Sequence, residues 1–433
     1  MTQISARTMV NQFKRSFGET RLNALGKRAK LCQRERTITP HRLALAMIEA
    51  FAGTDIDSIA DVHRTFNALC DQSVQYKPFH NQLAKKGFAE FTRRLLSQLL
   101  NELASDVLRL SPTSPFAKFK HICAHDGTSF ALKHTLAETF SGRFTTISPA
   151  AVELHVNLDL LSDAVNSVVM APDSESERQF LPPPSELHGD LLLADRGYFA
   201  RGYLAELQQA GGAFIVRGTA SMNPTIIKAL DATGGEIKSW RGKRLKELAT
   251  RIAKREAVDL TVRFQWQGQD FDCRLIAHPN LRAGTPRYLL TNLDRDEFTF
   301  EHIADGYRLR WQIELLFKEW KSHANLKAFD TNNAHIAEGL IWAALCAATL
   351  KRYCAHMTER LRQVAISTRR VAMCAHHVLT NVLRALLHAP GQLSRAITRT
   401  IDYLAQNAPR AHPKRDAKRG RLKIGLQHAF DVC

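Results

Sequence analysis

The fold is most constrained by a change in hydrophobic period near residue 115. Apolar residues recur at helical spacing before this point, and after it they alternate with polar ones, as in strands with one buried face. The alternating or short apolar segments are expected to form strands, at 119–124, 130–132, 151–161, 191–194 and 214–216. A helix is expected between the last two strands, so the order predicts an α/β domain of the RNase H-like class.

Two aspartates stand where this sheet would carry chemistry. Asp126, in Ala-His-Asp-Gly-Thr-Ser, follows the first expected strand, and Asp195, in Leu-Leu-Leu-Ala-Asp-Arg-Gly-Tyr, follows the strand at 191–194. Open sheets usually carry functional groups at or just past the ends of strands. Each residue also has a simpler interpretation, because Asp126 precedes a glycine as turn residues do and Asp195 could cap a helix.

The segment 307–321 is expected to form one amphipathic helix. Its apolar side chains share one stripe at helical spacing, and the adjoining face carries a phenol, three cations and one acid: Tyr307, Arg310, Lys318, Lys321 and Glu314. A carboxylate that binds a divalent cation beside phosphate groups would have such neighbours, because the cations would hold the phosphate oxygens. The simpler alternative is an Arg–Glu pair one turn apart on a surface helix.

The spacing within this segment favours the first interpretation. Tyr307, Arg310, Glu314 and Lys321, separated by two, three and six residues, resemble the YREK signature of bacterial insertion-sequence transposases. These are DDE enzymes of the insertion-sequence-four group, which includes the transposon-five enzyme. Trp311, directly after the arginine, also resembles that family. The two aspartates resemble its first and second catalytic aspartates, and the resemblance runs from about residue 118 to about residue 330.

The resemblance implies a catalytic and metal-binding triad of Asp126, Asp195 and Glu314, with two Mg²⁺ ions per site and Mn²⁺ as a substitute. Hard divalent cations prefer carboxylate oxygens, and two ions can activate the attacking oxygen and stabilise the leaving one. His121 and His125 lie four residues apart near the first aspartate. We do not expect them to bind the metal, because oxygen-rich magnesium sites rarely use imidazole.

Contacts with DNA are also implied by the resemblance. Tyr307, Arg310 and Lys321 would hold the transposon-end strand as it folds into a hairpin. The further contacts expected near the acids are Trp311, Lys318 and Arg196.

Residues 219–285 are expected to interrupt the core as a β-rich insertion, which the resembling family carries between its second and third acids. Strand-like runs flank a hairpin turn at 267–269, and the segment 287–292 would return to the main sheet. A tryptophan of the insertion would stack on a base flipped out of the strand. The sequence does not choose between Trp240 and Trp266, and a buried structural role is equally open for each.

The chain is expected to begin with a helical N-terminal domain that binds the DNA end, at residues 1–110. The core would follow in two parts around the insertion, at 116–218 and 286–334, and a helical C-terminal region for dimerisation or DNA contact would occupy 335–433. The first region would hold a helix-turn-helix-like unit with Lys85 and Lys86 facing DNA, or else a small helical bundle with a polar surface. The stretch 410–423 reads as a basic tail.

The charge of the chain points to a polyanionic partner. It has 60 Lys and Arg against 42 Asp and Glu, a formal net charge of +18 at pH 7, which favours DNA, RNA or an anionic membrane surface. The most apolar run, at 339–350, is too short to span a membrane, and no apolar segment opens the chain. The sequence contains no Cys-x-x-Cys pair, so a zinc ribbon or a redox dithiol is not expected. We therefore expect a cytoplasmic, nucleoid-associated protein that binds double-stranded DNA, both terminal inverted repeats and target DNA, and no membrane.

Together these features predict a cut-and-paste DNA transposase that cleaves strands, forms and opens hairpins, and transfers strands. Bringing two DNA ends together implies a homodimer in the synaptic complex. Two alternatives share the same core, namely a metal-dependent nuclease without strand transfer and a catalytically silent DNA-binding protein derived from a transposase. Short inverted repeats flanking the gene would favour the transposase over the nuclease, and cleavage activity would exclude the silent protein.

Overall fold

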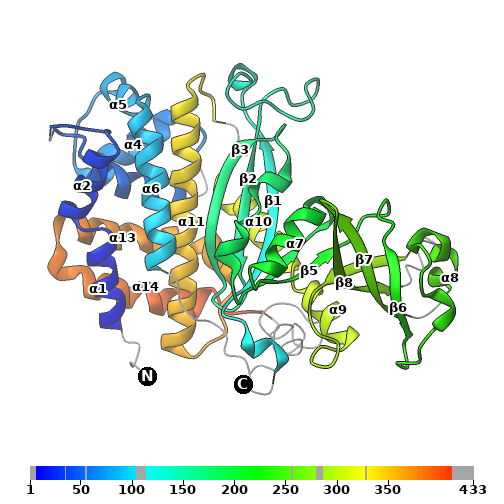
Figure 1. Ribbon diagram of the computed structural model, residues 1–433. Helices are drawn as coiled ribbons and strands as arrows, with labels where there is room; N and C mark the ends of the chain where they lie inside the picture. Colours follow the sequence, from blue (N-terminus) through cyan, green and yellow to red (C-terminus); the bar gives the residue numbers. More distant parts are fainter. Residues whose placement is uncertain are drawn as a thin grey trace.

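The structure is a computed structural model of the 433-residue chain. It describes residues 6–34, 36–53, 56–103, 114–254, 257–278, 286–326 and 329–411. Figure 1 shows two parts side by side, a bundle of helices from both ends of the chain and a long twisted sheet with helices against it. The expected fold class, an α/β core of the RNase H-like type with helical regions before and after it, is confirmed.

One sheet forms the core of the described residues. Its strands are β1 (Ile122–Ala131), β2 (Ala151–Asp159), β3 (Ala164–Pro172), β4 (Leu191–Ala194), β5 (Ala213–Arg217), β6 (Thr225–Asp231), β7 (Val258–Trp266), β8 (Gln269–His278) and β9 (Arg287–Thr291). They lie in the order β3-β2-β1-β4-β5-β9-β8-β7-β6. Because β1 to β3 pair antiparallel while β1, β4 and β5 pair parallel, the first five strands give the RNase H-like arrangement.

The expected break between the strands at 119–124 and 130–132 does not exist. β1 is continuous, and Asp126 lies in its middle, opposite Val156 of β2. The Asp-Gly pair resembles a turn in the sequence, but Gly127 instead makes room for a neighbour, since a Cβ there would lie 2.3 Å from Glu153 Oε1. The prediction that Asp126 follows a strand is therefore wrong, whereas Asp195 does follow β4 directly.

The strands of the expected insertion continue the same sheet. β6, β7 and β8 pair in series, and β8 pairs with β9, which pairs with β5. The expected return of the chain to the main sheet through β9 is thus confirmed. The hairpin after β7 is confirmed as well, because Gln267 and Gly268 have φ angles of 50° and 75°, as a tight two-residue hairpin turn requires. β3 and β6 are not among the expected strands, since neither alternates regularly between buried and exposed residues.

The helical bundle joins the two ends of the chain. Its helices are α1 (Ala6–Ser16), α2 (Glu19–Arg28), α3 (Pro40–Ala52), α4 (Ile59–Cys70), α5 (Tyr76–Leu83), α6 (Lys86–Glu102), α11 (Ala334–Arg362), α12 (Thr368–Cys374), α13 (His376–His388) and α14 (Leu393–Asn407). α11 packs against α3, α6 and α14. Most residues of its first half are buried on every side, as in a helix at the centre of a bundle.

Local signals explain where several of these helices begin. At the start of α3, Thr39 directly precedes Pro40, and its side chain accepts a hydrogen bond from the Arg42 N–H. At the start of α4, Ser58 and Asp61 form a capping box. Among the described residues, no helix is both long enough and apolar enough to cross a membrane. Nearly all of the expected basic tail lies outside the described residues, which end at 411. The proposed domain boundaries stay a prediction.

Candidate active site

The three predicted acids come from elements that pack on one another. The parallel register of β1 and β4 pairs His125 with Ala194. Asp126 and Asp195 are the next residues after this pair, Asp126 within β1 and Asp195 directly after β4. Glu314 lies in the first turn of α10 (Trp311–His323), and α10 packs against β1. The sheet and α10 therefore bring together residues that are far apart in the sequence.

The segment 307–321 is not one helix. It is divided between α9 (Phe300–Arg308) and α10, with a tight turn in which Leu309 N–H bonds Gly306 O at 3.1 Å and Arg310 N–H bonds Tyr307 O at 3.0 Å. The expectation of a single helix is wrong because the two halves pack on different strands, α9 on β5 and β9, and α10 on β1. The turn places the two side chains of the motif against different acids.

Tyr307 and Arg310 connect all three acids. The Tyr307 hydroxyl donates a hydrogen bond to Asp195 Oδ1 at 3.0 Å. Arg310 donates through Nη1 to Asp126 Oδ2 at 2.6 Å and through Nη2 to Glu314 Oε1 at 2.7 Å. The Arg310 side chain is only 12% exposed, so these charge-assisted bonds form largely out of bulk water, where they are strong.

The environments of the two aspartates shift their acidities in opposite directions. Burial raises the pKa of Asp126 to about 6, although the charge of Arg310 opposes the rise. Burial also acts to raise the pKa of Asp195, but the Arg196 N–H, the Arg310 charge and the Tyr307 hydroxyl outweigh it, and the pKa lies below its ordinary value. Asp195 is therefore ionised at neutral pH, and Asp126 becomes mostly ionised above about pH 6.

Arg217 is a cation of the site that the sequence did not indicate. It is the last residue of β5, and its Nη1 lies 3.8 Å from Asp195 Oδ1. β4 and β5 are parallel neighbours, so their carboxyl ends share one edge of the sheet. In the sequence, Arg217 stands at the end of the strand that follows Asp195, and this position was the signal from which the contact could have been inferred.

The donor set suits a hard divalent cation, because all three candidates are carboxylates. In the described part of the chain, however, no three side chains of His, Cys, Asp or Glu surround one point closely enough to hold an ion. The guanidinium of Arg310 lies between the carboxylates of Asp126 and Glu314. The chemistry of the acids fits a metal site, and two of the three acids are paired with Arg310.

Comparison with known proteins identifies the family of the chain. The model of the transposase DDE domain matches residues 117–350, which is more than half of the chain. The chain belongs to this family. The match includes all three candidate acids and the segment 307–321.

Curated relatives of this DDE domain protein are transposases of insertion sequences. The transposase for insertion sequence element IS1151 of Clostridium perfringens is 23% identical over 345 residues, covering 71% of this chain and 72% of the relative. The transposase for IS231F of Bacillus thuringiensis subsp. israelensis is 20% identical over 448 residues, covering 93% and 92%. The putative transposase InsL for IS186A of Escherichia coli (strain K12) is 44% identical over 77 residues, 18% of this chain and 21% of the relative.

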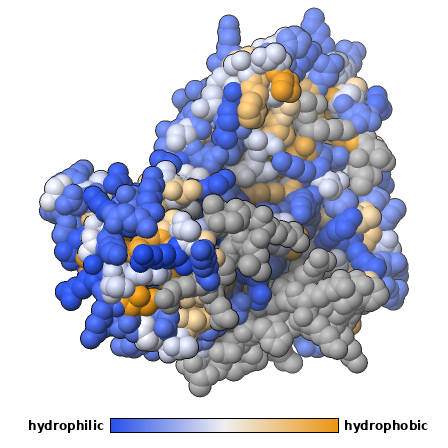
Figure 2. Space-filling view, turned by 90° about the vertical axis from the view of Figure 1, so that its right-hand side faces the viewer, coloured by the Kyte–Doolittle hydropathy of each residue, from blue (hydrophilic) through white to orange (hydrophobic). Residues whose placement is uncertain are grey.

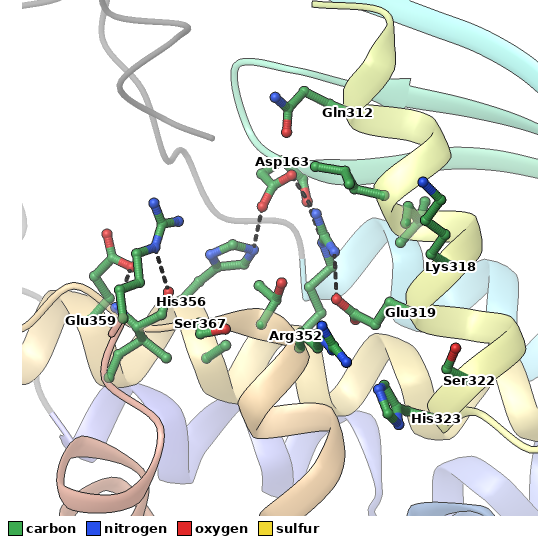
Figure 3. A pocket seen from close by; sticks show the side chains of 17 residues that line it. Asp163, Gln312, Lys318, Glu319, Ser322, His323, Arg352, His356, Glu359 and Ser367 are labelled. Carbon is green, nitrogen blue, oxygen red and sulfur yellow. Dashed lines mark hydrogen bonds and ion pairs between the residues drawn. The ribbon is translucent and has the colours of Figure 1, made fainter. Parts of the chain in front are cut away.

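In this DDE domain, charged side chains connect α10, the helix that carries Glu314, with α11 and with the turn between β2 and β3 (Figure 3). Arg352 of α11 forms an ion pair with Asp163 in the turn between β2 and β3, and its Nη1 lies 3.6 Å from Glu319 Oε2 of α10. His356 Nε2 lies 3.3 Å from Asp163 Oδ2. These residues line a cavity of about 490 Å³ between α10, α11 and α12. The sequence gave no sign of this network, because its members are separated by as many as 193 positions.

Lys351, the neighbour of Arg352, is a second anchor for α10. Its side chain is 2% exposed, and its Nζ donates to the backbone oxygens of His323 and Ala372 at 3.2 and 3.0 Å. His323 ends α10 and Ala372 lies in α12. One lysine therefore connects α10, α11 and α12, and fixes the end of α10 opposite to Arg310.

His125 lies next to Asp126 but does not behave as a ligand. Its side chain is buried, and its ring packs edge-on against Tyr198 with the centroids 4.8 Å apart. Burial lowers the pKa of His125 to about 3, so it is neutral at physiological pH. This supports a role in shaping the site. His121 faces Asp159, with Nδ1 3.3 Å from Oδ2.

The other expected DNA contacts differ in their exposure. Trp311, Lys318 and Lys321 lie exposed on α10, and Lys318 Nζ is 4.6 Å from the Trp311 ring centroid. The other expected contacts, Arg196, Lys85 and Lys86, are exposed as well. Figure 2 shows one face of the molecule, where hydrophilic residues surround several apolar patches.

The two tryptophans of the insertion have different surroundings. Trp240 is 2% exposed within an apolar cluster, so a structural role is favoured. Trp266 is half-buried and lines a groove of about 930 Å³ together with Arg178 and Arg201. Of the two, only Trp266 lies where a base could reach it.

Proposed function

We propose that this chain is a DNA transposase that moves an insertion sequence by a cut-and-paste route, and that its segment 307–321 is a YREK motif of the insertion-sequence-four type. The observation that carries the proposal is the contact of Tyr307 and Arg310 with all three acids. An ordinary surface Arg–Glu pair would have no reason to include Asp126, which is 184 positions from Arg310. A motif that positions a phosphate beside two metal ions would need this proximity.

Asp126, Asp195 and Glu314 would hold two Mg²⁺ ions, with Mn²⁺ as a substitute. When bound, these ions activate the attacking oxygen and stabilise the leaving one. Water first cleaves one strand at the transposon end, and the freed 3′-OH attacks the opposite strand to form a hairpin. A second water opens the hairpin, and the 3′-OH then attacks target DNA. Each step breaks one P–O bond and forms another at the same phosphorus, with water as the attacking group in two steps and the 3′-OH in the other two, so one set of acids can serve all four.

The neighbouring cations would hold the DNA during these steps. Arg310 would bind a phosphate of the transposon end with two parallel hydrogen bonds, supported by Tyr307 and by Lys321 at the last turn of α10. Arg217 adds positive charge at the same edge of the sheet. Trp266 would be the base-stacking residue. We further propose that the N-terminal helices bind the DNA end through Lys85 and Lys86, and that two copies of the chain form the synaptic complex.

The proposal is tested with end-labelled DNA that carries the inverted repeats flanking the gene. Wild-type protein should give nicked, hairpin and blunt products with Mg²⁺ or Mn²⁺, and none with EDTA or Ca²⁺. Glu314→Gln should bind this DNA normally and fail to cleave it, because it loses a metal ligand and little shape. Arg310→Ala should retain some first-strand nicking and lose the hairpin products.

The outcomes separate the alternatives. Full activity in EDTA, or normal cleavage by Glu314→Gln, would overturn the assignment of the acids. Cleavage without hairpin or strand-transfer products would indicate a nuclease of the same fold. Specific DNA binding without cleavage under any metal would indicate a silent, transposase-derived DNA-binding protein.

A further inference from the structure

Every acid of the triad already has a partner from the turn between α9 and α10. Arg310 Nη1 lies 2.6 Å from Asp126 Oδ2, and its Nη2 lies 2.7 Å from Glu314 Oε1. Asp195 accepts a hydrogen bond from the Tyr307 hydroxyl at 3.0 Å. One guanidinium therefore occupies the space between two of the three carboxylates.

This arrangement is incompatible with a metal ion on the same oxygens. Divalent cations bind carboxylate oxygens at about 2.0–2.6 Å. An ion at such a distance from Asp126 Oδ2 and Glu314 Oε1 would be in contact with the guanidinium nitrogens, and the like charges would repel strongly in this partly buried site. Arg310 must leave before Asp126 Oδ2 and Glu314 Oε1 can share an ion.

Arg310 is not fully satisfied where it lies. Its Nε is buried and makes no hydrogen bond to any described residue, which is unfavourable for a charged donor group. A phosphodiester accepts guanidinium donors in parallel pairs. A DNA phosphate beside the site can therefore compete with the two carboxylates for Arg310.

We infer that Arg310 closes the metal site in the free protein, and that a DNA phosphate opens it by drawing the guanidinium away from Asp126 and Glu314. DNA and metal both favour the open arrangement, so each raises the affinity of the other by the same factor. This inference rests on the proposed function, because it assigns the metal to the triad. Its consequence is that the complete metal site assembles only on DNA.

The first test measures Mn²⁺ binding to the full chain without DNA, from the electron paramagnetic resonance signal of the free ion. Arg310→Ala should bind Mn²⁺ at least tenfold more tightly than wild type, because the competing cation is gone. Arg308→Ala is the matched control. It removes a cation two residues away that pairs with Asp305 at 3.0 Å, and it should change the affinity less than threefold.

The second test measures the linkage from the side of DNA. Fluorescence anisotropy gives the affinity for a 20-base-pair duplex of arbitrary sequence, with and without Ca²⁺ at constant ionic strength. Ca²⁺ should tighten duplex binding severalfold more in wild type than in Arg310→Ala, because only the wild-type protein couples the two ligands through this arginine. An equal effect of Ca²⁺ on the two proteins would overturn the linkage.

The outcomes distinguish this inference from the proposed function. If Arg310→Ala binds Mn²⁺ no more tightly than Arg308→Ala, Arg310 does not close the site, and the proposed function stands. Asp126→Asn should abolish the Mn²⁺ binding gained by Arg310→Ala. If no protein shows Mn²⁺ binding that depends on Asp126, the metal assignment and the proposed function both fail. Arg310→Gln, which keeps hydrogen-bond donors without the charge, repeats the comparison should thermal unfolding show that Arg310→Ala is not folded.

Discussion

Replacing Lys351 by Met should change how the stability of the protein depends on pH. The lysine is buried in the middle of α11, where its Nζ bonds the backbone oxygens of His323 and Ala372. Burial lowers its pKa from an ordinary 10.5 to about 8, although Glu319 favours the charged form. Methionine is similar in length and shape and carries no charge, so Lys351→Met removes the titration and keeps most of the packing.

The expected change follows from proton linkage. Between about pH 8 and pH 10.5, the unfolded chain keeps the proton that the folded protein has lost from Lys351. The unfolded state then binds more protons, so raising the pH stabilises the folded state. Below about pH 8 the lysine is charged in both states and adds no pH dependence. The two pKa values predict that this one residue adds about 2.5 kcal/mol to the free energy of unfolding at pH 10 relative to pH 7.

Urea unfolding followed by tryptophan fluorescence at pH 7, 8.5 and 10 measures this effect. The difference between wild type and Lys351→Met isolates the lysine, because other titrating groups are present in both proteins. Lys321→Met, at an exposed position of α10, is the control and should give a difference that does not vary with pH. A wild-type advantage over Lys351→Met that is constant within about 0.5 kcal/mol, or that falls as the pH rises, would refute the buried titration.

Three further predictions concern the anchors, the strand and the charge. Arg352→Met removes the guanidinium that pairs with Asp163 and Glu319, so that Asp163 keeps only its contact with His356, and should lower the free energy of unfolding by about 3–5 kcal/mol, measured by urea unfolding; a loss below about 1 kcal/mol would contradict a largely buried ion pair. Gly127→Ala should cost about 1–3 kcal/mol through overpacking and slow DNA cleavage by moving Asp126, whereas Gly391→Ala, with nothing within 4 Å of the added carbon, should change neither. The affinity for nonspecific duplex should fall steeply with salt, with a log–log slope of about −0.9 per phosphate contact; deleting residues 412–433 should make the slope shallower in filter binding, and an unchanged slope would show that they do not bind DNA.

Short-range patterns explain the successful part of the sequence interpretation. The spacing of Tyr307, Arg310 and Glu314 was readable because residues three and four apart are neighbours on helical backbone, and the turn after Arg308 changes this only locally. The apolar run at 191–194 predicted β4 and the position of Asp195, because a short buried strand depends on its own side chains. The same reasoning failed for Asp126, where a local Asp-Gly signal for a turn was overridden by pairing along the whole of β2.

The sequence by itself determined the class of fold and the family, and it pointed to three acids as candidates, because these depend on hydrophobic period and on residue types at fixed spacing. Only the tertiary structure decided what each acid touches. The register of β1 with β4, the bend at Arg310 and the anchoring of α10 through Arg352 are contacts between residues remote in the chain. No local pattern encodes such contacts, because they exist only after separate elements have buried their apolar faces against one another.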